Sequence, residues 1–537
     1  MPQIRSKPWI VQKYGGTSLG KLLHTITSDI IPRYLNSHKV AVVCSARSNK
    51  SKSEGTTSML LDAIRFAILG DIGRLNQVLE LIEDDHQAAA SQAISGGTEE
   101  MLAKVQREIS NDCEMLRCVL KATSTLGEIS ENTTDRVLAV GETLACRIVT
   151  AALQSKGIFA EVVILDDIVE RSYGKDHRDL LSKFGQHPTA FLRGLTNAIA
   201  QKIDPCTGIP VITGFFGVMP GSLIKTISRG YSDLCAALCA IALDAQELQI
   251  WKEVDGIFTA DPRKIKSARL LKTITSEEAA ELTYYGSEVI HPLTIEQIVQ
   301  AEITIRLKNV TNPNGDGTVI YPSYRPLSPS PLSGRKSAER PLTQNFNVSK
   351  TIAKNNFMTT NGYYGPNLSR RTPTAITVKE GVIVLNIHSH GSTSSQAFLY
   401  QISSILQKQC IVVDLISSTQ QTLSLAVCSP ETHSLQQAIE EVQRFGIVST
   451  MDQMSIVSVI GHNMRNMVGI GLEIFSALAS ARVNIYLISQ GASEINISFV
   501  VKAQNAQLAM QVVHTNVMRI PQHAEQENAF AKGPWLY

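Results

Sequence analysis

Between Trp9 and Tyr321, short apolar runs alternate with longer stretches in which apolar and polar positions recur with helical spacing. This alternation is typical of an α/β layer fold, in which buried strands are joined by helices. The runs that predict buried strands are Trp9–Lys13, Val40–Cys44, Glu161–Leu165, Pro210–Thr213, Leu248–Trp251 and Thr304–Lys308.

Helices are predicted most clearly over residues 71–152, which carry few strand signals and much Ala, Leu, Glu and Gln. A turn at Ser95-Gly96-Gly97 is expected to break this region into several helices. Further along, Thr275 and Glu278 stand three residues apart before an apolar run. Since this is the pattern of a capping box, we expect another helix to start there.

The alternation stops between Pro322 and Pro373, where Pro, Ser, Arg and Asn dominate and no periodicity is sustained. This composition predicts a flexible linker over residues 322–373. A solvated loop packed on the surface is the alternative interpretation.

A weak internal repeat begins at Thr374. Strand-like, helix-like and strand-like runs follow one another, first at Val382–His388, Ala397–Gln407 and Ile411–Ile416, then at Ser455–Gly461, Gly469–Ala481 and Val483–Ile488. We therefore expect two small βαβ-type units in tandem, over residues 374–450 and 451–525.

Composition narrows the class of protein. The chain has 537 residues, enough for two to four domains, and its net charge of +2 gives no reason to expect nucleic acid or a membrane surface as partner. No apolar run reaches membrane-spanning length, and the first strand begins where a signal peptide would need its apolar core. The nine cysteines form no C-x-x-C pair, which fits a reducing compartment, and we expect a cytoplasmic protein.

The first candidate for chemistry is the segment Lys13-Tyr14-Gly15-Gly16-Thr17-Ser18, which lies between a predicted strand and a helix. Glycines let backbone N–H groups approach an anion closely, so this loop predicts a phosphate site. Thr17 or Ser18 is expected to cap the helix. Residues Gly15 to Lys21 match most of a Walker A motif, but Leu22 stands where that motif needs Ser or Thr. Lys13 is therefore the better candidate for the cation that binds phosphate.

Two further segments carry charge beside predicted helix or strand ends. In Ser228–Asp233, an Arg side chain can grip a carboxylate and Asp233 can hold a cation or an ammonium group. A helix capped by Ser232 with Arg229 on the surface is the plainer interpretation. The segment Trp251–Arg263 predicts a structured loop at a strand end, where ligands bind in α/β folds, or else an ordinary hairpin with exposed charges.

In order and separation, these segments resemble the aspartokinase branch of the amino-acid kinase family. Lys13–Ser18 is similar to its K-[FY]-G-G-T-S motif, Ser228–Asp233 to R-G-x-S-D, Trp251–Arg263 to the loop ending D-P-R, and Tyr285–Pro292 to G-[AS]-x-V-[IL]-H-P. The resemblance covers residues 9–321 and is closest to fungal single-function members. It implies a three-layer sandwich with a central, mainly parallel sheet, followed by two ferredoxin-like ACT domains.

The resemblance also implies roles for individual residues. Lys13, Arg229 and Asp233 would be catalytic, with Arg229 on the α-carboxylate of L-aspartate. The aspartate pocket would comprise Ser45, Thr57, Glu142, Phe215, Arg229, Gly230 and Ser232. The residues expected at ATP are Lys13, Gly15, Gly16, Thr17, Ser18, Lys252, Glu253, Phe258 and Arg263. ATP and Mg²⁺ would be required, no residue is assigned as a metal ligand, and Glu288 replaces a nucleotide-binding lysine of many bacterial relatives.

Regulation is implied by the ACT repeat, with L-threonine as the expected inhibitor and pairing of these units as the expected route to a homo-oligomer. The residues expected to line the effector site are Asp414, Leu415, Ile416, Gln490 and Asn496. Two alternatives stay open at this point: a glutamate-type kinase with a similar phosphate loop, and a catalytically silent amino-acid sensor.

Overall fold

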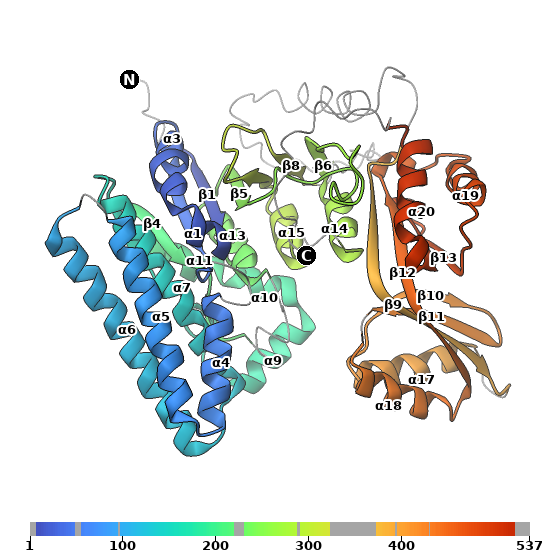
Figure 1. Cartoon of the computed structure of the whole chain (residues 1–537), viewed down its shortest axis with the longest axis horizontal. Helices are drawn as coiled ribbons and strands as arrows, with labels where there is room; N and C mark the ends of the chain where they lie inside the picture. Colours follow the sequence, from blue (N-terminus) through green and yellow to red (C-terminus); the bar gives the residue numbers. More distant parts are fainter. Residues whose placement is uncertain are drawn as a thin grey trace, which may run out of the picture. The chain divides into compact units, whose positions relative to one another are not determined.

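The computed structural model describes residues 7–48, 55–94, 97–219, 230–286, 290–322, 372–391, 395–428 and 430–520. The chain divides into two compact units (Figure 1). The first comprises Met1–Gly256 and Ile290–Ser323, and the second Ile257–Val289 and Tyr324–Tyr537. Apart from Pro322, Thr372 and Pro373, the predicted linker lies outside the described residues.

The first unit is built around a mainly parallel sheet with the strand order β3-β4-β2-β1-β5-β7-β8. Among the strand pairs described within this order, β7 and β8 are antiparallel and the others are parallel. All the strands predicted in this region are present, so the α/β prediction is confirmed. Their bounds are β1 (Trp9–Tyr14), β2 (Lys39–Cys44), β3 (Ala160–Val163), β4 (Ile209–Thr213), β5 (Glu247–Lys252), β7 (Thr304–Asn309) and β8 (Thr318–Tyr321).

Helices cover both faces of this sheet. Alternate residues of a strand point to opposite faces, and Val40, Val42 and Cys44 pack in one core with η1, α3 and α7. Helix α13 packs on β1, β2 and β5 outside that core, beside α11 and α15. The helices of this sandwich other than α7 are α1 (Gly16–Lys21), α2 (Leu23–Thr25), η1 (Ile26–Ile30), α3 (Ile31–Leu35), α8 (Ile168–Tyr173), α9 (His177–Gln186), α10 (Pro188–Gly194), α11 (Thr196–Ile203), α13 (Tyr231–Ala242) and α15 (Pro292–Gln300).

A bundle of long helices extends from the sandwich, as predicted for residues 71–152 (Figure 1). It comprises α4 (Thr56–Ile68), α5 (Ile72–Ala93), α6 (Glu99–Leu126) and α7 (Glu131–Gln154). By length and composition alone, α7 could cross a membrane. However, most of it is buried, because one side packs in the core of the bundle and the other against the sheet.

The second unit contains an antiparallel sheet with the order β10-β11-β9-β12-β14-β13. Its strands are β9 (Ala375–Ser389), β10 (Val413–Ser418), β11 (Thr422–Cys428), β12 (Gly446–Ile460), β13 (Leu487–Gln490) and β14 (Asn496–Lys502). Its helices are α17 (Ser395–Lys408), α18 (Thr432–Val442), η3 (His462–Met464), α19 (Ile470–Ser480) and α20 (Ala503–Asn516).

The predicted repeat appears as two ferredoxin-like units that share their long central strands. The second half of β9 pairs with β11 and with the first half of β12, whereas the first half of β9 pairs with the second half of β12. Residues 382–454 therefore form one unit that is inserted into the other, and the predicted tandem arrangement with a boundary at residue 450 is wrong. The last strand of the repeat, predicted at Val483–Ile488, is observed later, as β13.

The segment 257–289 packs with the second unit although it precedes the repeat by more than eighty residues. It contains β6 (Thr273–Thr275) and α14 (Ser276–Tyr284). Phe258, Ile265 and Ala268 lie in the same core as residues of β9, β12, α19 and α20. The predicted capping box is confirmed: Thr275 accepts a bond from the Glu278 N–H at 3.2 Å, and Glu278 accepts one from the Thr275 N–H at 2.9 Å.

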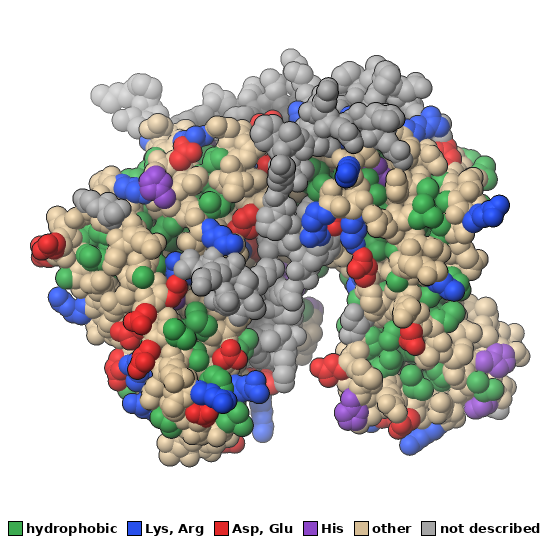
Figure 2. Space-filling model, viewed as in Figure 1, with side chains coloured by type: hydrophobic (Ala, Val, Ile, Leu, Met, Phe, Trp, Pro, Cys, Tyr) green, Lys and Arg blue, Asp and Glu red, His purple; other side chains and the backbone are tan. Residues whose placement is uncertain are grey.

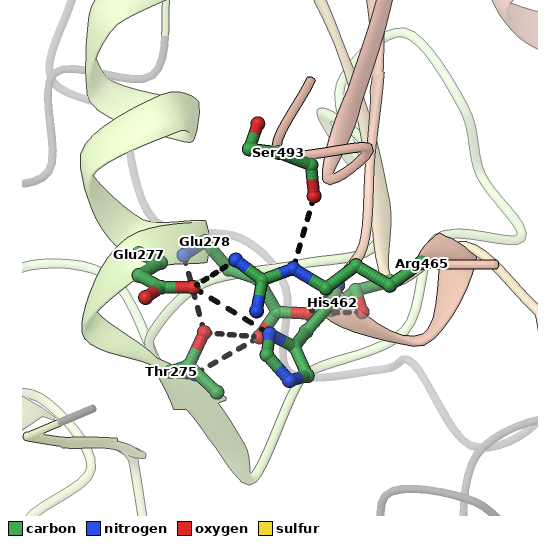
Figure 3. Close-up of polar contacts among 7 residues, drawn as sticks. Thr275, Glu277, Glu278, His462, Arg465 and Ser493 are labelled. Carbon is green, nitrogen blue, oxygen red and sulfur yellow. Dashed lines mark hydrogen bonds and ion pairs between the residues drawn. The ribbon is translucent and has the colours of Figure 1, made fainter. Parts of the chain in front are cut away.

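Two acidic side chains of α14 bind the loop after β12 (Figure 3). Glu278, which is 4% exposed, accepts the backbone N–H of His462 at 2.7 Å and the hydroxyl of Thr374 at 2.6 Å as well as its capping bonds. Glu277 lies 3.4 Å from the Arg465 guanidinium, whose Nε donates to the carbonyl of Ser493 at 2.9 Å. Helix α14 is thereby attached to the second ferredoxin-like unit by buried as well as exposed polar contacts.

Candidate active site

A buried ion pair lies at the carboxyl end of β1. The Nζ of Lys13 lies 2.6 Å from Oδ1 of Asp233, which belongs to the first turn of α13. Both side chains are less than one-tenth exposed, at 8% and 6%. Since a charge buried there without its partner would be costly, the pair fixes both side chains at this sheet edge.

The glycine loop next to Lys13 is held close to the loop that follows β2. A Cβ atom on Gly16 would lie 2.1 Å from the Ala46 carbonyl oxygen, so only glycine fits there. Gly16 also accepts the backbone N–H of Ser48 at 3.0 Å. Because no side chain fits at Gly16, backbone atoms line this turn, as in loops that bind phosphate.

The capping predicted for this loop is wrong. Helix α1 starts at Gly16 with Gly15 as its N-cap, so Thr17 and Ser18 lie inside the helix. Ser18 instead donates its hydroxyl to Oε1 of Glu253 at 2.6 Å, which connects α1 to the end of β5. Two of the residues expected at ATP are therefore joined directly.

Polar groups of the expected aspartate pocket meet beside this ion pair. The hydroxyls of Ser45 and Ser232 lie 2.7 Å apart. A Cβ on Gly214 would lie 2.6 Å from Ser232 Cβ and 2.8 Å from Oε1 of Glu142, so the absence of a side chain at Gly214 lets these residues meet. Ser232 lies within α13, whose N-cap is Gly230 at φ 84°, so the alternative in which Ser232 caps the helix is wrong.

Glu142 has an unusual protonation equilibrium. Burial raises the pKa of its carboxyl to about 8, although Lys13 and the backbone N–H of Phe215 act in the opposite direction. Its Oε2 atom is buried and has no hydrogen-bond partner among the described residues. The carboxyl is thus a buried acceptor that an ammonium group could pair with.

Asp233 differs from Glu142 although the two lie in the same site. Burial acts to raise the pKa of Asp233, but Lys13, Lys252 and His291 outweigh it and hold the pKa below its usual value. The site therefore combines one ionised carboxylate with one carboxyl that keeps its proton near neutral pH.

Other predicted residues have different surroundings. Phe215 is buried, with its ring 5.8 Å from that of Tyr231, and Lys252 ends β5. Thr57 is exposed in the first turn of α4. Arg229 and Glu288 lie outside the described residues.

Phe258 and Arg263, both expected at the nucleotide, belong to the second unit. Phe258 is 6% exposed in the hydrophobic core of that unit. The Nη2 of Arg263 lies 2.9 Å from Oδ2 of Asp261. Their role at ATP stays a prediction.

Sequence reasoning missed Tyr231 and His291. The Tyr231 hydroxyl accepts the Phe216 N–H at 3.1 Å and donates to the Gly217 carbonyl at 3.2 Å, so it shapes the turn after β4. His291 caps α15 through the Leu293 N–H at 3.2 Å, and burial lowers its pKa. Tyr231 lies inside the Ser228–Asp233 motif and His291 inside the Tyr285–Pro292 motif. Their positions in these motifs could therefore have identified them as candidates.

The expected effector residues lie on three strands of the second unit. Asp414, with a fully buried side chain, pairs with Lys379 at 2.6 Å, and Leu415 lies in the core. Ile416 and Gln490 are exposed. Asn496 donates to Oε2 of Glu281, on α14, at 2.9 Å.

A buried lysine beside a glycine loop, at the carboxyl edge of a parallel sheet, defines a site for a small anionic substrate and a phosphate. The model of the amino acid kinase family matches residues 8–309, and an ACT domain model matches residues 457–517. The chain is 40% identical to the aspartokinase of Schizosaccharomyces pombe over 99% of this chain and 98% of that one. It is 42% identical to the Candida albicans aspartokinase over 95% and 90% of the two chains.

The fold agrees with these sequence similarities. Escherichia coli aspartokinase III, solved with aspartate and ADP, superposes with a TM-score of 0.65 at 21% identity, covering 95% of this chain and 99% of that one. The aspartate kinase of Clostridium acetobutylicum gives a TM-score of 0.64. The chain therefore belongs to the aspartokinases, a branch of the amino acid kinase family.

Proposed function

We propose that this aspartate kinase transfers the γ-phosphoryl group of ATP to the β-carboxylate of L-aspartate, giving 4-phospho-L-aspartate, and that L-threonine inhibits it through the ACT units. The product would supply the threonine, methionine and isoleucine branch of biosynthesis. The observation that carries the proposal is the buried Lys13–Asp233 pair between the glycine loop and the Glu142 pocket.

Positioning and charge neutralisation carry most of the work in phosphoryl transfer. Asp233 orients the Lys13 ammonium group towards the glycine loop, where it stabilises negative charge on the transferring phosphoryl oxygens. A carboxylate nucleophile with a reference pKa of about 3.9 is already ionised at neutral pH, so the site needs no general base.

The pocket provides a place for the amino-acid end of the substrate. The Oε2 of Glu142 is buried without a partner among the described residues, and the Ser45 and Ser232 hydroxyls lie together next to it. An ammonium group paired with Glu142 would satisfy that oxygen. We propose that Arg229 binds the α-carboxylate and that Lys252 and Glu253 lie towards the nucleotide.

Mg²⁺ would neutralise phosphate charge when it is bound with ATP. Among the described residues, no group of three His, Cys, Asp or Glu side chains could hold a metal ion. This fits the usual binding of Mg²⁺, which relies on substrate phosphates and one or two carboxylates. Two carboxylates lie beside the glycine loop: Asp233 pairs with Lys13 at 2.6 Å, and Glu253 accepts the Ser18 hydroxyl at 2.6 Å.

Contacts around α14 support regulation through the ACT units. The effector candidate Asn496 bonds Glu281, and Lys379, which pairs with the candidate Asp414, lies 5.2 Å from the centre of the Tyr284 ring. Both candidates thus reach the segment 257–289, part of which carries the D-P-R motif. An effector that shifts β10 or β14 would therefore also change the contacts of the segment 257–289.

Three further properties belong to the proposal. In the parts of the chain that the structure describes, none of the nine cysteines forms a disulfide, which supports a reducing, cytoplasmic location. Positive and negative side chains are interspersed on the face shown in Figure 2, which favours small molecules over nucleic acid or a membrane as partners. The exposed edge strands β10 and β13 support pairing of ACT units between chains.

The test is ATP-dependent formation of an acyl phosphate, trapped with hydroxylamine, from L-aspartate and from L-glutamate as control. Threonine or lysine is added in parallel. Hydroxamate from aspartate alone, lowered by threonine alone, is the expected result. Activity that threonine does not change would remove the effector from the proposal, and no hydroxamate with Mg²⁺ present would remove the kinase reaction.

A further inference from the structure

A buried arginine connects the active-site loop to the helical bundle. Arg47 stands two residues after Ser45, and its side chain is 5% exposed. Its guanidinium forms an ion pair with Asp85 in the middle of α5. The carbonyl of Arg47 accepts the Thr56 N–H at 3.0 Å, so both its backbone and its side chain bind the bundle.

The loop of residues 45–48, which contains Arg47, contacts the active site on the side that faces away from the bundle. Ser45 meets Ser232, the Ala46 carbonyl faces Gly16, and Ser48 donates its N–H to Gly16. Residues 45–48 therefore lie between the glycine loop and the bundle, and any shift of Arg47 moves atoms that line both the phosphate side and the aspartate side.

The bundle is closely packed where it receives this loop. A Cβ on Gly141, the residue before Glu142, would lie 3.0 Å from Ala46 Cβ and 3.1 Å from Thr56 Cγ2. His86, fully buried, donates from Nδ1 to the Ile82 carbonyl at 2.7 Å, and its Nε2 lies 3.5 Å from the Thr56 hydroxyl. Two fixed helices thus hold the loop on the side away from the substrates.

We infer that Arg47 and Asp85 are positioning residues, whose ion pair holds loop 45–48 so that the glycine loop and Ser45 keep the geometry needed for phosphoryl transfer. The inference rests on the proposed kinase reaction. Displacements of about 1 Å can cost about 10²-fold in rate, so a pair that fixes this loop acts on kcat without touching a substrate.

The test replaces both charges at once, because removing one would leave the other buried and unpaired. The Arg47→Met/Asp85→Leu variant is expected to keep the wild-type melting temperature within a few degrees. Its kcat in the hydroxamate assay should fall by about tenfold or more, with a smaller change in KM for ATP and aspartate. The Arg47→Lys variant, which retains a cation for Asp85, should recover part of this loss.

The matched control is Arg147→Met/Asp112→Leu, a half-buried ion pair that joins α7 to α6 within the same bundle. It should leave kcat unchanged. If the Arg47/Asp85 variant is folded and has wild-type kcat, or loses no more than the control, the positioning role is excluded. If the wild-type protein itself forms no hydroxamate, the kinase proposal fails first, and the two failures are therefore distinguishable.

Discussion

Lys13 and Lys21 show how the surroundings of a residue decide its role. Both are lysines next to the glycine loop, and Lys21 stands where a Walker A motif would place its lysine. The structure leaves Lys21 exposed at the end of α1, whereas Lys13 is buried against Asp233. A buried, oriented ammonium group stabilises transition-state charge far better than a solvated one.

Lys13→Ala is therefore expected to lower kcat by about 10²–10³ or more, because a fixed charge donor is lost from the phosphoryl site. The measurement is hydroxamate formation at saturating ATP and aspartate. Lys21→Ala is the control and should keep near wild-type turnover. Near-normal activity of Lys13→Ala would exclude Lys13 as the residue that stabilises charge on the transferring phosphoryl group.

Glu142 predicts a pH effect on substrate binding. Its pKa of about 8 means that the free site holds a proton at pH 7, and an ammonium group would favour the ionised form. Titration calorimetry in two buffers of different ionisation enthalpy should show release of about one proton per aspartate at pH 7 and less above pH 8. Wild-type binding without proton release would contradict this role.

The same pKa has a consequence for stability. The folded protein keeps the Glu142 proton up to about pH 8, whereas an unfolded chain releases it near the ordinary glutamate pKa of 4.5. The free energy of unfolding of the substrate-free protein should therefore fall as pH rises between these values. Glu142→Gln should remove this part of the pH dependence.

At this scale, the motifs predicted which residues meet but not how they bond. Lys13 of β1, Ser45 after β2, Glu142 of α7 and the neighbours Ser232 and Asp233 of α13 are brought together in the structure. The direct pairing of Lys13 with Asp233 was not predicted, because the motif indicated only that Asp233 can hold a cation or an ammonium group. Side-chain direction depends on backbone angles such as the positive φ of Gly230, which the sequence does not reveal.

Among the elements, α14 combines an ordinary helix start with long-range contacts. Its capping box could be read from Thr275 and Glu278 alone, because the bonds are local. The additional bonds of Glu278 could not, since Thr374 and His462 lie 96 and 184 residues away. Burial of Glu278 makes these bonds matter, because a donor left unpaired there costs more than one in water.

Removing the two halves of this capping box should have different effects. Thr275→Ala should lower the free energy of unfolding by about 1 kcal/mol through loss of the cap. Glu278→Ala also leaves the Thr374 hydroxyl and the His462 N–H without their acceptor. We therefore expect a loss of about 1–3 kcal/mol in the free energy of unfolding, and weaker threonine inhibition. Denaturant unfolding and inhibition curves measure both.

Thr98→Ala provides the matched control, because Thr98 caps α6 in the first unit by accepting the Met101 N–H at 3.3 Å. It should cost a similar cap energy and leave inhibition unchanged. Equal inhibition in all three variants would show that α14 does not carry the regulatory signal.

On the scale of the whole molecule, the order of segments along the chain does not show which of the two units each segment packs in. The pattern predicted one catalytic region over residues 9–321, but residues 257–289 pack with the second unit. Hydrophobic residues such as Phe258 and Ile265 gave no sign of which core they would join, since burial alone does not specify a partner. The local patterns nevertheless predicted β1 to β5 and β7 of the first sheet, and parts of β9, β10, β12 and β13 of the second. The strands β8, β11 and β14 were not predicted.

Deleting residues 374–537 should consequently give an insoluble or unfolded protein rather than an uninhibited kinase. The deletion uncovers Phe258, Ala260, Ile265 and Ala268, and the large side chains of Phe258 and Ile265 each cost about 1.5–3 kcal/mol to expose. Soluble yield and limited proteolysis test this. A soluble, active truncation would contradict it, and one still inhibited by threonine would also exclude an effector site in the deleted residues.

The shared central strands have a consequence for engineering. Chain entry and exit of the inserted ferredoxin-like unit lie next to each other, because Val382 of β9 pairs with Met454 of β12. Segments whose two ends are adjacent can be replaced with little disturbance to the host. Residues 382–454 therefore form a segment that can be exchanged as one piece. Replacing it with the corresponding stretch of a relative would transfer the Asp414–Ile416 part of the proposed effector site and leave Gln490 and Asn496 unchanged.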